Sequence, residues 1–193
     1  MGSQWSRDKV YLRAKNEGFR SRASFKLIEI QEKFSVIRKD DNIVDLGAAP
    51  GSWLQVLRTL TEGRVLGIDL NPIASLDGIE TIEGDLTDLS IQSQTRELLG
   101  MINVVVCDAA PKLSGHKSYD QARAIALGEE ALQFACNVLK IGGNFVIKSF
   151  QGADFPELIA EVRDHFHAVK TYSTKATRKG STEVYIIAKN FKG

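Results

Sequence analysis

The chain has 193 residues, with 43% hydrophobic and 25% charged side chains and a net charge of +1, which suits one globular domain with a sizeable core. No run of about eighteen apolar residues occurs and the N-terminal part is polar and basic, so we expect no membrane span, no secretory signal and a cytoplasmic location. Cys107 and Cys136 lie in apolar segments and should stay reduced, and three histidines are too few for a familiar metal site.

Residues 5–22 interleave aromatic and basic side chains, among them Trp5, Arg7, Phe19 and Arg20. Cations contact phosphates and aromatic rings stack on unpaired bases, so this composition favours a contact with nucleic acid. A disordered leader is the alternative interpretation.

A helix is predicted from Ser21, as its N-cap, to about Phe34. Leu27, Ile30 and Phe34 would lie on its buried side. Lys26 stands at the edge of that side, where a lysine usually extends its ammonium group to the surface.

The stretch Ile43–Trp53 combines a short apolar strand, a turn of small residues and the start of a helix that runs to about Leu60. Such a turn is typical of nucleotide pockets, because glycines allow close approach and a helix start offers free N–H groups. Asp45 stands where a carboxylate can reach a cationic ligand group. Three residues separate Gly47 from Gly51, unlike the dinucleotide pattern Gly-x-Gly-x-x-Gly. The loop therefore favours S-adenosylmethionine, and a turn without a ligand is the alternative.

Three further acids lie at or just past the ends of predicted strands. These strands cover residues 64–70, 79–84 and 102–108. Asp69 is placed to accept hydrogen bonds from the two hydroxyls of a ribose, Asp85 can meet an adenine amino group, and Asp108 ends the last of the three strands. Because parallel strands end at one edge of a sheet, Asp45 and these three acids should line that edge.

The remaining elements continue the alternation of helices and strands. Helices are predicted over residues 89–99, 119–140 and 154–166, with Gly142-Gly143 ending the second, and strands over residues 144–150, 168–173 and 183–191. Residues 112–118 form a candidate substrate lid, and residues 174–181 form a basic loop. The predicted fold is a single α/β domain over residues 1–193, with a seven-stranded, mostly parallel sheet and helices on both faces.

Lys148 is a basic residue within an apolar predicted strand. An unpaired ammonium group there would be costly, so Lys148 needs a carboxylate partner or must lose its proton. Asp108, at the end of the neighbouring strand, is the natural partner. A buried lysine that loses its proton can act as a general base, and a purely structural Lys–Asp pair is the alternative.

Several segments of the chain closely resemble those of the FtsJ-like ribosomal RNA 2′-O-ribose methyltransferases, in order from about Lys9 to Lys189. These segments are Arg20-Ser-Arg-Ala-Ser-Phe-Lys-Leu27, Asp45-Leu-Gly-Ala-Ala-Pro-Gly-Ser-Trp53, Cys107-Asp-Ala-Ala-Pro-Lys-Leu-Ser-Gly115, Gly143-Asn-Phe-Val-Ile-Lys-Ser-Phe-Gln-Gly152 and Ser181-Thr-Glu-Val-Tyr-Ile-Ile-Ala188. The resemblance implies a Rossmann-like class I fold that uses S-adenosylmethionine.

The resemblance also implies a set of site residues. The catalytic set would be Lys26, Asp108, Lys148 and Glu183. The methyl donor would be bound by Gly51, Trp53, Asp69, Asp85 and Asp108, in addition to Asp45 and Gly47 of the same loop. The family often has a glycine where Ser52 stands, and this departure affects the fine geometry of the loop.

Methyl transfer to a ribose hydroxyl is an in-line displacement at a sulfonium carbon, so it needs positioning of the hydroxyl and removal of its proton, and no metal is expected. Our hypothesis is that Lys148 is the base. Lys26 would oppose protonation of Lys148 and orient the hydroxyl, while Asp108 and Glu183 would hold the two lysines. The implied substrate is a uridine ribose of large-subunit ribosomal RNA, within the large ribosomal subunit.

Three alternatives stay open. The same chemistry could act on transfer RNA or another RNA. The chain could be a non-catalytic RNA-binding assembly factor, against which the intact Lys-Asp-Lys-Glu set argues. It could be a dinucleotide oxidoreductase, against which the missing glycine pattern argues.

Charge is segregated along the chain. Residues 1–39 carry ten Lys/Arg and four Asp/Glu, residues 40–164 carry nine and nineteen, and residues 165–193 carry six and one, for net charges of +6, −10 and +5. Basic ends on an acidic body indicate a polyanionic partner, and unconnected solvated charges are the alternative. We expect a monomer in which residues 1–20 form a basic extension that contributes to RNA binding.

Overall fold

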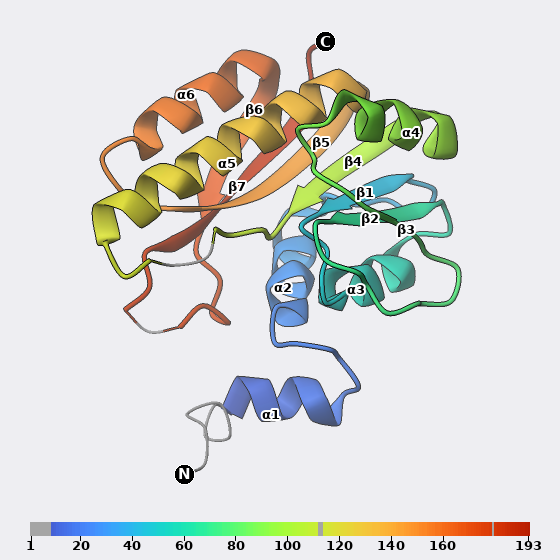
Figure 1. Ribbon diagram of the computed structural model, residues 1–193, viewed down its shortest axis with the longest axis horizontal. Coiled ribbons are helices and arrows are strands. Elements are labelled where there is room, and N and C mark those ends of the chain that lie inside the picture. Colours follow the sequence, from blue (N-terminus) through green and yellow to red (C-terminus); the bar gives the residue numbers. More distant parts are fainter. Residues whose placement is uncertain (1–8, 112–113, 179) are drawn as a thin grey trace.

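The structure is a computed structural model that describes residues 9–111, 114–178 and 180–193 (Figure 1). The helices are α1 (Lys9–Asn16), α2 (Ser24–Phe34), α3 (Ser52–Leu60), α4 (Leu89–Leu99), α5 (Lys117–Val138) and α6 (Phe155–His165). The strands are β1 (Ile43–Leu46), β2 (Val65–Asp69), β3 (Glu80–Glu83), β4 (Ile102–Cys107), β5 (Leu139–Phe150), β6 (Phe166–Tyr172) and β7 (Glu183–Phe191). Within these described ranges, no helix has both the length and the apolar character needed to span a membrane.

The strands form one seven-stranded sheet in the order β3-β2-β1-β4-β5-β7-β6. Strands β1 to β5 run parallel to one another, and β7 is antiparallel to both β5 and β6. The predicted mostly parallel sheet is thus confirmed. The chain winds from β1 outward through β2 and β3, and then crosses to β4 on the other side of β1. This reversal creates a switch point between β1 and β4, where the carboxyl ends of parallel strands bind ligands.

Helices cover both faces of the sheet, because alternate residues of a strand point to opposite sides. Val44 and Leu46 of β1 belong to the core beneath α4, α5 and α6, whereas Ile43 belongs to the core shared with α2 and α3. Figure 1 shows these two groups of helices on opposite sides of the sheet. The continuous burial of β1 explains why it lacks the polar alternation of a half-exposed strand.

Helix α2 begins later than predicted, at Ser24, with Ala23 rather than Ser21 as its N-cap residue. The hydroxyl of Ser21 instead accepts hydrogen bonds from the Ala23 N–H at 3.2 Å and from the Ser52 hydroxyl at 2.7 Å. Ser21 therefore links the segment before α2 to the first residue of α3. The predicted burial of Leu27 and Ile30 is confirmed, whereas Phe34 is only partly buried.

The boundary between α5 and β5 also differs from the prediction. The helix ends at Val138, and Leu139 already pairs with Ile102 of β4. Asn144 pairs with Val104, so the residues between the two pairs form an irregularity of β5 that includes Gly142, with φ of +79°. The two glycines thus lie within the strand instead of ending the helix.

Helix α1 was not expected from the sequence. Its eight residues interleave apolar and basic side chains, which hides the helical period, although Ala14 is buried. Figure 1 shows α1 apart from the sheet, beyond the first turn of α2. Trp5 and Arg7 of the predicted basic extension lie outside the described residues.

Candidate active site

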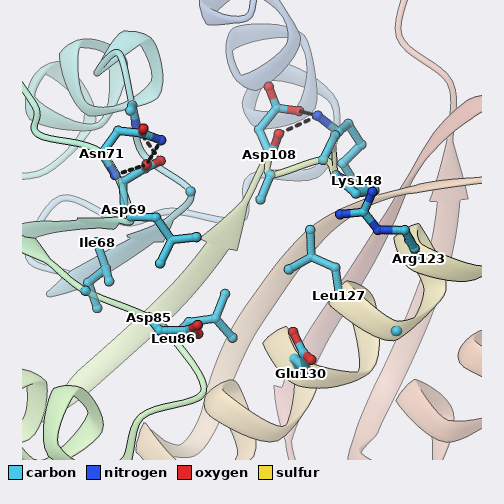
Figure 2. Close-up of a pocket in the computed structure, with 18 residues that line it drawn as sticks. Ile68, Asp69, Asn71, Asp85, Leu86, Asp108, Arg123, Leu127, Glu130 and Lys148 are labelled. Carbon is cyan, nitrogen blue, oxygen red and sulfur yellow. Dashed lines mark hydrogen bonds and ion pairs between the residues drawn. The ribbon is translucent and has the colours of Figure 1, made fainter. Parts of the chain in front are cut away.

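A cavity of about 750 Å³ opens at the carboxyl ends of the parallel strands. Asp69, Asp85, Asp108 and Lys148 all line it, together with Gly47 (Figure 2). The strand-end acids therefore come together at one edge of the sheet, as their positions in the sequence predicted, with Asp45 set deeper than the other three.

The carboxylates of Asp69 and Asp85 are held by local hydrogen bonds. The Asp69 carboxylate accepts from the Ala49 backbone N–H at 2.9 Å. It also accepts from the backbone N–H of Asn71 at 2.8 Å and from the side-chain amide of Asn71 at 2.9 Å. Asp85 accepts from the backbone N–H and the hydroxyl of Thr87. Both carboxylates are thus fixed on the wall of the cavity before any ligand arrives.

A second cavity, of about 160 Å³, shares Gly47, Ala49 and Asp108 with the first and is also lined by Asp45. Asp45 is 1% exposed, and neither carboxylate oxygen has a hydrogen-bond partner among the described residues. Burial raises the pKa of Asp45 well above its usual value, and the nearby Asp108 and Asp69 raise it further. A buried carboxylate without a partner is costly unless a donor group binds to it.

The glycines of the loop allow this close packing. Gly47 has a φ of +69°, and a Cβ added to it would lie 2.4 Å from the Cβ of Ala109, in the turn after β4. Gly51 has a φ of +102° and is the N-cap residue of α3. The turns after β1 and β4 can therefore approach each other only with glycine at position 47.

Trp53 lies in the first turn of α3 and lines the smaller cavity. Its indole N–H donates to the Ala23 carbonyl at 2.9 Å, and its ring stacks on Tyr185 with 5.9 Å between ring centroids. The indole N–H is therefore already used inside the protein. The backbone N–H of Trp53, at a helix start, remains the group suited to a ligand.

The four residues of the implied catalytic set converge from α2, β5, β7 and the turn after β4. Lys148 Nζ on β5 lies 3.2 Å from Asp108 Oδ1 and also donates to the Asp108 carbonyl. Lys26 Nζ on α2 lies 2.7 and 2.8 Å from the two oxygens of Glu183 on β7, and 3.9 Å from Asp108 Oδ1. The four side chains are only 8–15% exposed. Two lysines and two carboxylates thus alternate in one largely buried cluster.

Tyr185 is a further member of this cluster that the sequence did not single out. Its hydroxyl donates to Asp108 Oδ1 at 2.6 Å, and Tyr185 pairs with Lys148 across β5 and β7. Burial raises the pKa of Tyr185, and Asp108 raises it further, so the phenol stays protonated as a donor. The signal was present in the sequence, because Glu183 and Tyr185 are two residues apart on one strand and so share a face.

Burial raises the pKa of Glu183, but the Lys26 ammonium and the hydrogen bonds to the carboxylate more than reverse that effect. The net result is a lowered pKa, so Glu183 is ionised at neutral pH. The ion pair between Lys26 and Glu183 is therefore intact under ordinary conditions, which keeps the Lys26 ammonium beside Asp108.

The two basic ends of the chain are adjacent in the fold. The Tyr172 hydroxyl on β6 bonds to Glu29 on α2, and Lys189 Nζ on β7 donates to the Phe34 carbonyl at 3.1 Å. Helix α2, in the basic N-terminal part of the chain, therefore packs beside strands β6 and β7 of the basic C-terminal part. This placement disfavours unconnected solvated charges.

Both cysteines are free, with Cys107 buried and Cys136 half-buried. Burial raises the pKa of the Cys107 thiol to about 12, so it stays protonated. Within the described part of the chain, no three His, Cys, Asp or Glu side chains form a group that could hold a metal ion.

Comparison with known proteins supports a common origin for this site. The chain is 84% identical, with both chains covered in full, to the ribosomal RNA large subunit methyltransferase E of Methanoregula boonei. It is 68% identical over its whole length to the protein of the same name from Methanosphaerula palustris, of which 95% is covered. A crystal structure described as a ribosomal RNA methyltransferase of Plasmodium falciparum superposes with a TM-score of 0.81 at 27% identity, covering 91% of this chain and 100% of that one.

The family model of the FtsJ-like methyltransferases matches residues 19–191. This range includes every residue of the two cavities and of the catalytic cluster. The chain therefore belongs to the FtsJ-like methyltransferase family.

Proposed function

We propose that this chain transfers the methyl group of S-adenosylmethionine to the 2′-hydroxyl of a uridine ribose in large-subunit ribosomal RNA. The observation that carries the proposal is the convergence of Lys26, Asp108, Lys148 and Glu183 beside the cavities. The family membership supports methyl transfer, and the names of the relatives with 84% and 68% identity support the ribosomal substrate.

The two cavities fit an elongated, cationic donor. Asp69 and Asp85 on the wider cavity suit the ribose hydroxyls and the adenine amino group. The orphaned Asp45 carboxylate at the narrow end suits the ammonium of the methionine moiety, which would supply the hydrogen bonds that it lacks. Gly51 and the backbone N–H of Trp53 suit the carboxylate of that moiety.

The cluster then performs the proton chemistry. S-adenosylmethionine supplies an electrophilic methyl group when bound. The ribose oxygen forms the new O–C bond as the S–C bond breaks, and neutral Lys148 takes the hydroxyl proton. Lys26 keeps its charge through Glu183 and orients the hydroxyl, while Asp108 holds Lys148. Alignment of the reacting atoms and removal of the proton are the contributions of the protein.

We further propose that the partner is the RNA of the large ribosomal subunit and that the chain acts as a monomer in the cytoplasm. The basic ends support an RNA partner, because Lys175 of the C-terminal part is held on α2 by Glu29, three residues after Lys26. The two free, protonated cysteines support a reducing compartment.

The test is an incubation with radiolabelled S-adenosylmethionine and, separately, large ribosomal subunits, naked ribosomal RNA and transfer RNA, followed by mapping of the methylated ribose. We expect label in the large subunit or its RNA. Lys148→Ala should lower incorporation by at least about a hundredfold while donor affinity, measured by calorimetry, changes little. Lys39→Ala, an exposed lysine paired with Glu62, is the matched control and should retain activity.

Three results would change the proposal. Label found only in transfer RNA would keep the mechanism and replace the substrate. Donor binding without label in any RNA would favour the non-catalytic assembly factor. Full activity of Lys148→Ala would assign the base to another residue.

A further inference from the structure

The Glu183 carboxylate has a hydrogen-bond partner beyond Lys26 that none of the family motifs includes. The Thr177 hydroxyl donates to Glu183 Oε1 at 2.8 Å. Lys26 contacts both oxygens of the same carboxylate. Thr177 lies in the loop between β6 and β7, so this loop reaches into the catalytic cluster.

The two threonine hydroxyls of this loop form a chain of hydrogen bonds that runs toward Glu183. The Thr174 and Thr177 hydroxyl oxygens are 3.0 Å apart, and either could be the donor by geometry alone. Each hydroxyl has one hydrogen, and that of Thr177 points to an ionised carboxylate, which can only accept. Thr174 must therefore donate to Thr177, which in turn donates to Glu183. Such chains strengthen each bond through polarisation, and Thr174 is only 5% exposed.

The turn that presents Thr177 is anchored on α2. The Thr177 N–H donates to the Thr174 carbonyl at 3.1 Å, which closes the turn. The Lys175 N–H donates to both oxygens of Glu29, at 2.9 and 3.2 Å. Glu29 lies three residues after Lys26, on the same helix. One helix therefore carries the lysine and also holds the loop that orients its carboxylate partner.

The other side of the same turn carries positive charge. The side chains of Lys175 and Arg178 are exposed, whereas Ala176 between them is buried and Thr177 is half-buried. Basic side chains thus point to solvent while the threonine hydroxyl points to Glu183. The segment is built to contact a polyanion on one side and the active site on the other.

We infer that Thr177 is a positioning residue for methyl transfer, which acts by holding the Glu183 carboxylate and thereby the Lys26 ammonium beside the ribose hydroxyl. The inference rests on the proposed function for the reaction itself. Removing the Thr177 hydroxyl leaves the Glu183 carboxylate held by Lys26 alone, so the two paired side chains can move together and Lys26 is less often in its productive position. Donor binding is unaffected, because Thr177 does not line either cavity.

The test compares Thr177→Val, which keeps the shape without the hydroxyl, with Thr177→Ser, which keeps the hydroxyl. Thr171→Val, an exposed threonine on β6, is the matched control. We expect Thr177→Val to lower kcat about tenfold or more, as the loss of a hydrogen bond to a charged group predicts. The KM for RNA and the affinity for S-adenosylmethionine should stay within about twofold, and Thr177→Ser should restore kcat to within about twofold.

The pKa of Glu183 separates positioning from mere loop stability. The groups that face Glu183 are Lys26 from α2, Lys148 from β5 and Tyr185 on its own strand, with Asp108 beyond Lys26. All four remain in Thr177→Val, so only the lost hydrogen bond changes the titration. The pKa of Glu183 should rise, because the hydrogen bond from Thr177 helps to lower it. A purely structural role would lower thermal stability without this rise in the pKa.

Titration of the Glu183 carboxyl by carbon-detected NMR measures the same contact without activity. A pKa and a kcat in Thr177→Val that equal those of Thr171→Val would overturn the inference. A wild-type protein that binds S-adenosylmethionine but methylates no RNA would instead refute the proposed function, and the NMR comparison would still decide whether Thr177 holds Glu183.

Discussion

Under the proposed function, Asp45 combines a stability cost with a ligand-binding role. Its carboxylate is buried without a hydrogen-bond partner among the described residues, and burial raises its pKa. A carboxyl group with a raised pKa in the folded state costs stability when it is ionised, and the cost disappears as the pH falls toward its unfolded value of about 3.9. This is the pattern expected of a residue kept for binding.

We therefore expect Asp45→Asn to stabilise the ligand-free protein at pH 7 by about 1 kcal/mol or more, while weakening binding of S-adenosylmethionine at least about tenfold. The gain should shrink as the pH falls toward about 4, because wild-type Asp45 then takes up a proton. Urea unfolding at several pH values and calorimetry with the donor measure the two effects. A stability difference that does not change with pH would contradict this account.

Tyr185 supports Asp108 at the centre of the cluster. Tyr185→Phe removes the hydroxyl that donates to Asp108 Oδ1 and leaves the stacking on Trp53 in place. We expect a loss of about 1 kcal/mol in the free energy of unfolding and about a tenfold fall in methylation rate, measured by urea unfolding and single-turnover assays.

Tyr119→Phe is the control for this substitution, because Tyr119 is 57% exposed. It should leave stability and rate unchanged. Equal rates for Tyr185→Phe and wild type would mean that the two lysines hold Asp108 without help.

At the scale of secondary-structure elements, the approach of the β1 and β4 turns depends on Gly47. A Cβ at Gly47 would lie 2.4 Å from Ala109 Cβ, whereas a Cβ at Gly142 would have no atom within 4 Å. Both glycines have a positive φ, of +69° and +79°. A comparison of alanine substitutions at these two glycines therefore separates the stability lost through the backbone conformation from the stability lost through crowding.

Gly142→Ala should destabilise the protein by about 1–2 kcal/mol through its backbone conformation alone. Gly47→Ala should cost about 1–3 kcal/mol more, because it also forces the two turns apart, and only Gly47→Ala should weaken donor binding. Urea unfolding and donor calorimetry of both variants provide the comparison. Similar losses of stability and affinity in the two variants would show that the turns separate freely.

At the scale of the whole molecule, the segregated charge should determine how tightly RNA binds. The slope of log affinity against log salt falls by about one for each phosphate contact that is lost. We expect Lys15→Gln on α1 and Lys175→Gln after β6 each to reduce the slope by about one, without changing the rate at saturating RNA.

Lys39→Gln removes the same positive charge as the other two substitutions, from a lysine that is 72% exposed and paired with Glu62. It should leave the slope unchanged. Filter binding of a large-subunit RNA fragment over a range of salt concentrations measures all three variants. A uniform effect of the three substitutions would show that net charge alone attracts the RNA.

The sequence by itself determined most of the local elements and the positions of the acids at the strand ends. The glycine spacing after Asp45, the acids at the strand ends and the buried Lys148 are features of residues close together in the chain, and the fold brings the acids to one edge because parallel strands share a direction. The apolar periods of α3 and α4 likewise gave their bounds correctly.

Only the tertiary structure decided which partners the polar side chains find. Ser21 looked like a helix cap but bonds to Ser52, and Glu183 meets Lys26 from the far end of the chain. The contacts of Thr177 with Glu183 and of Tyr185 with Asp108 depend on a hydroxyl arriving within 3 Å of its acceptor. Hydrogen bonds are this short and directional, whereas hydrophobic periodicity specifies only which face of an element is buried, so no local pattern could supply them.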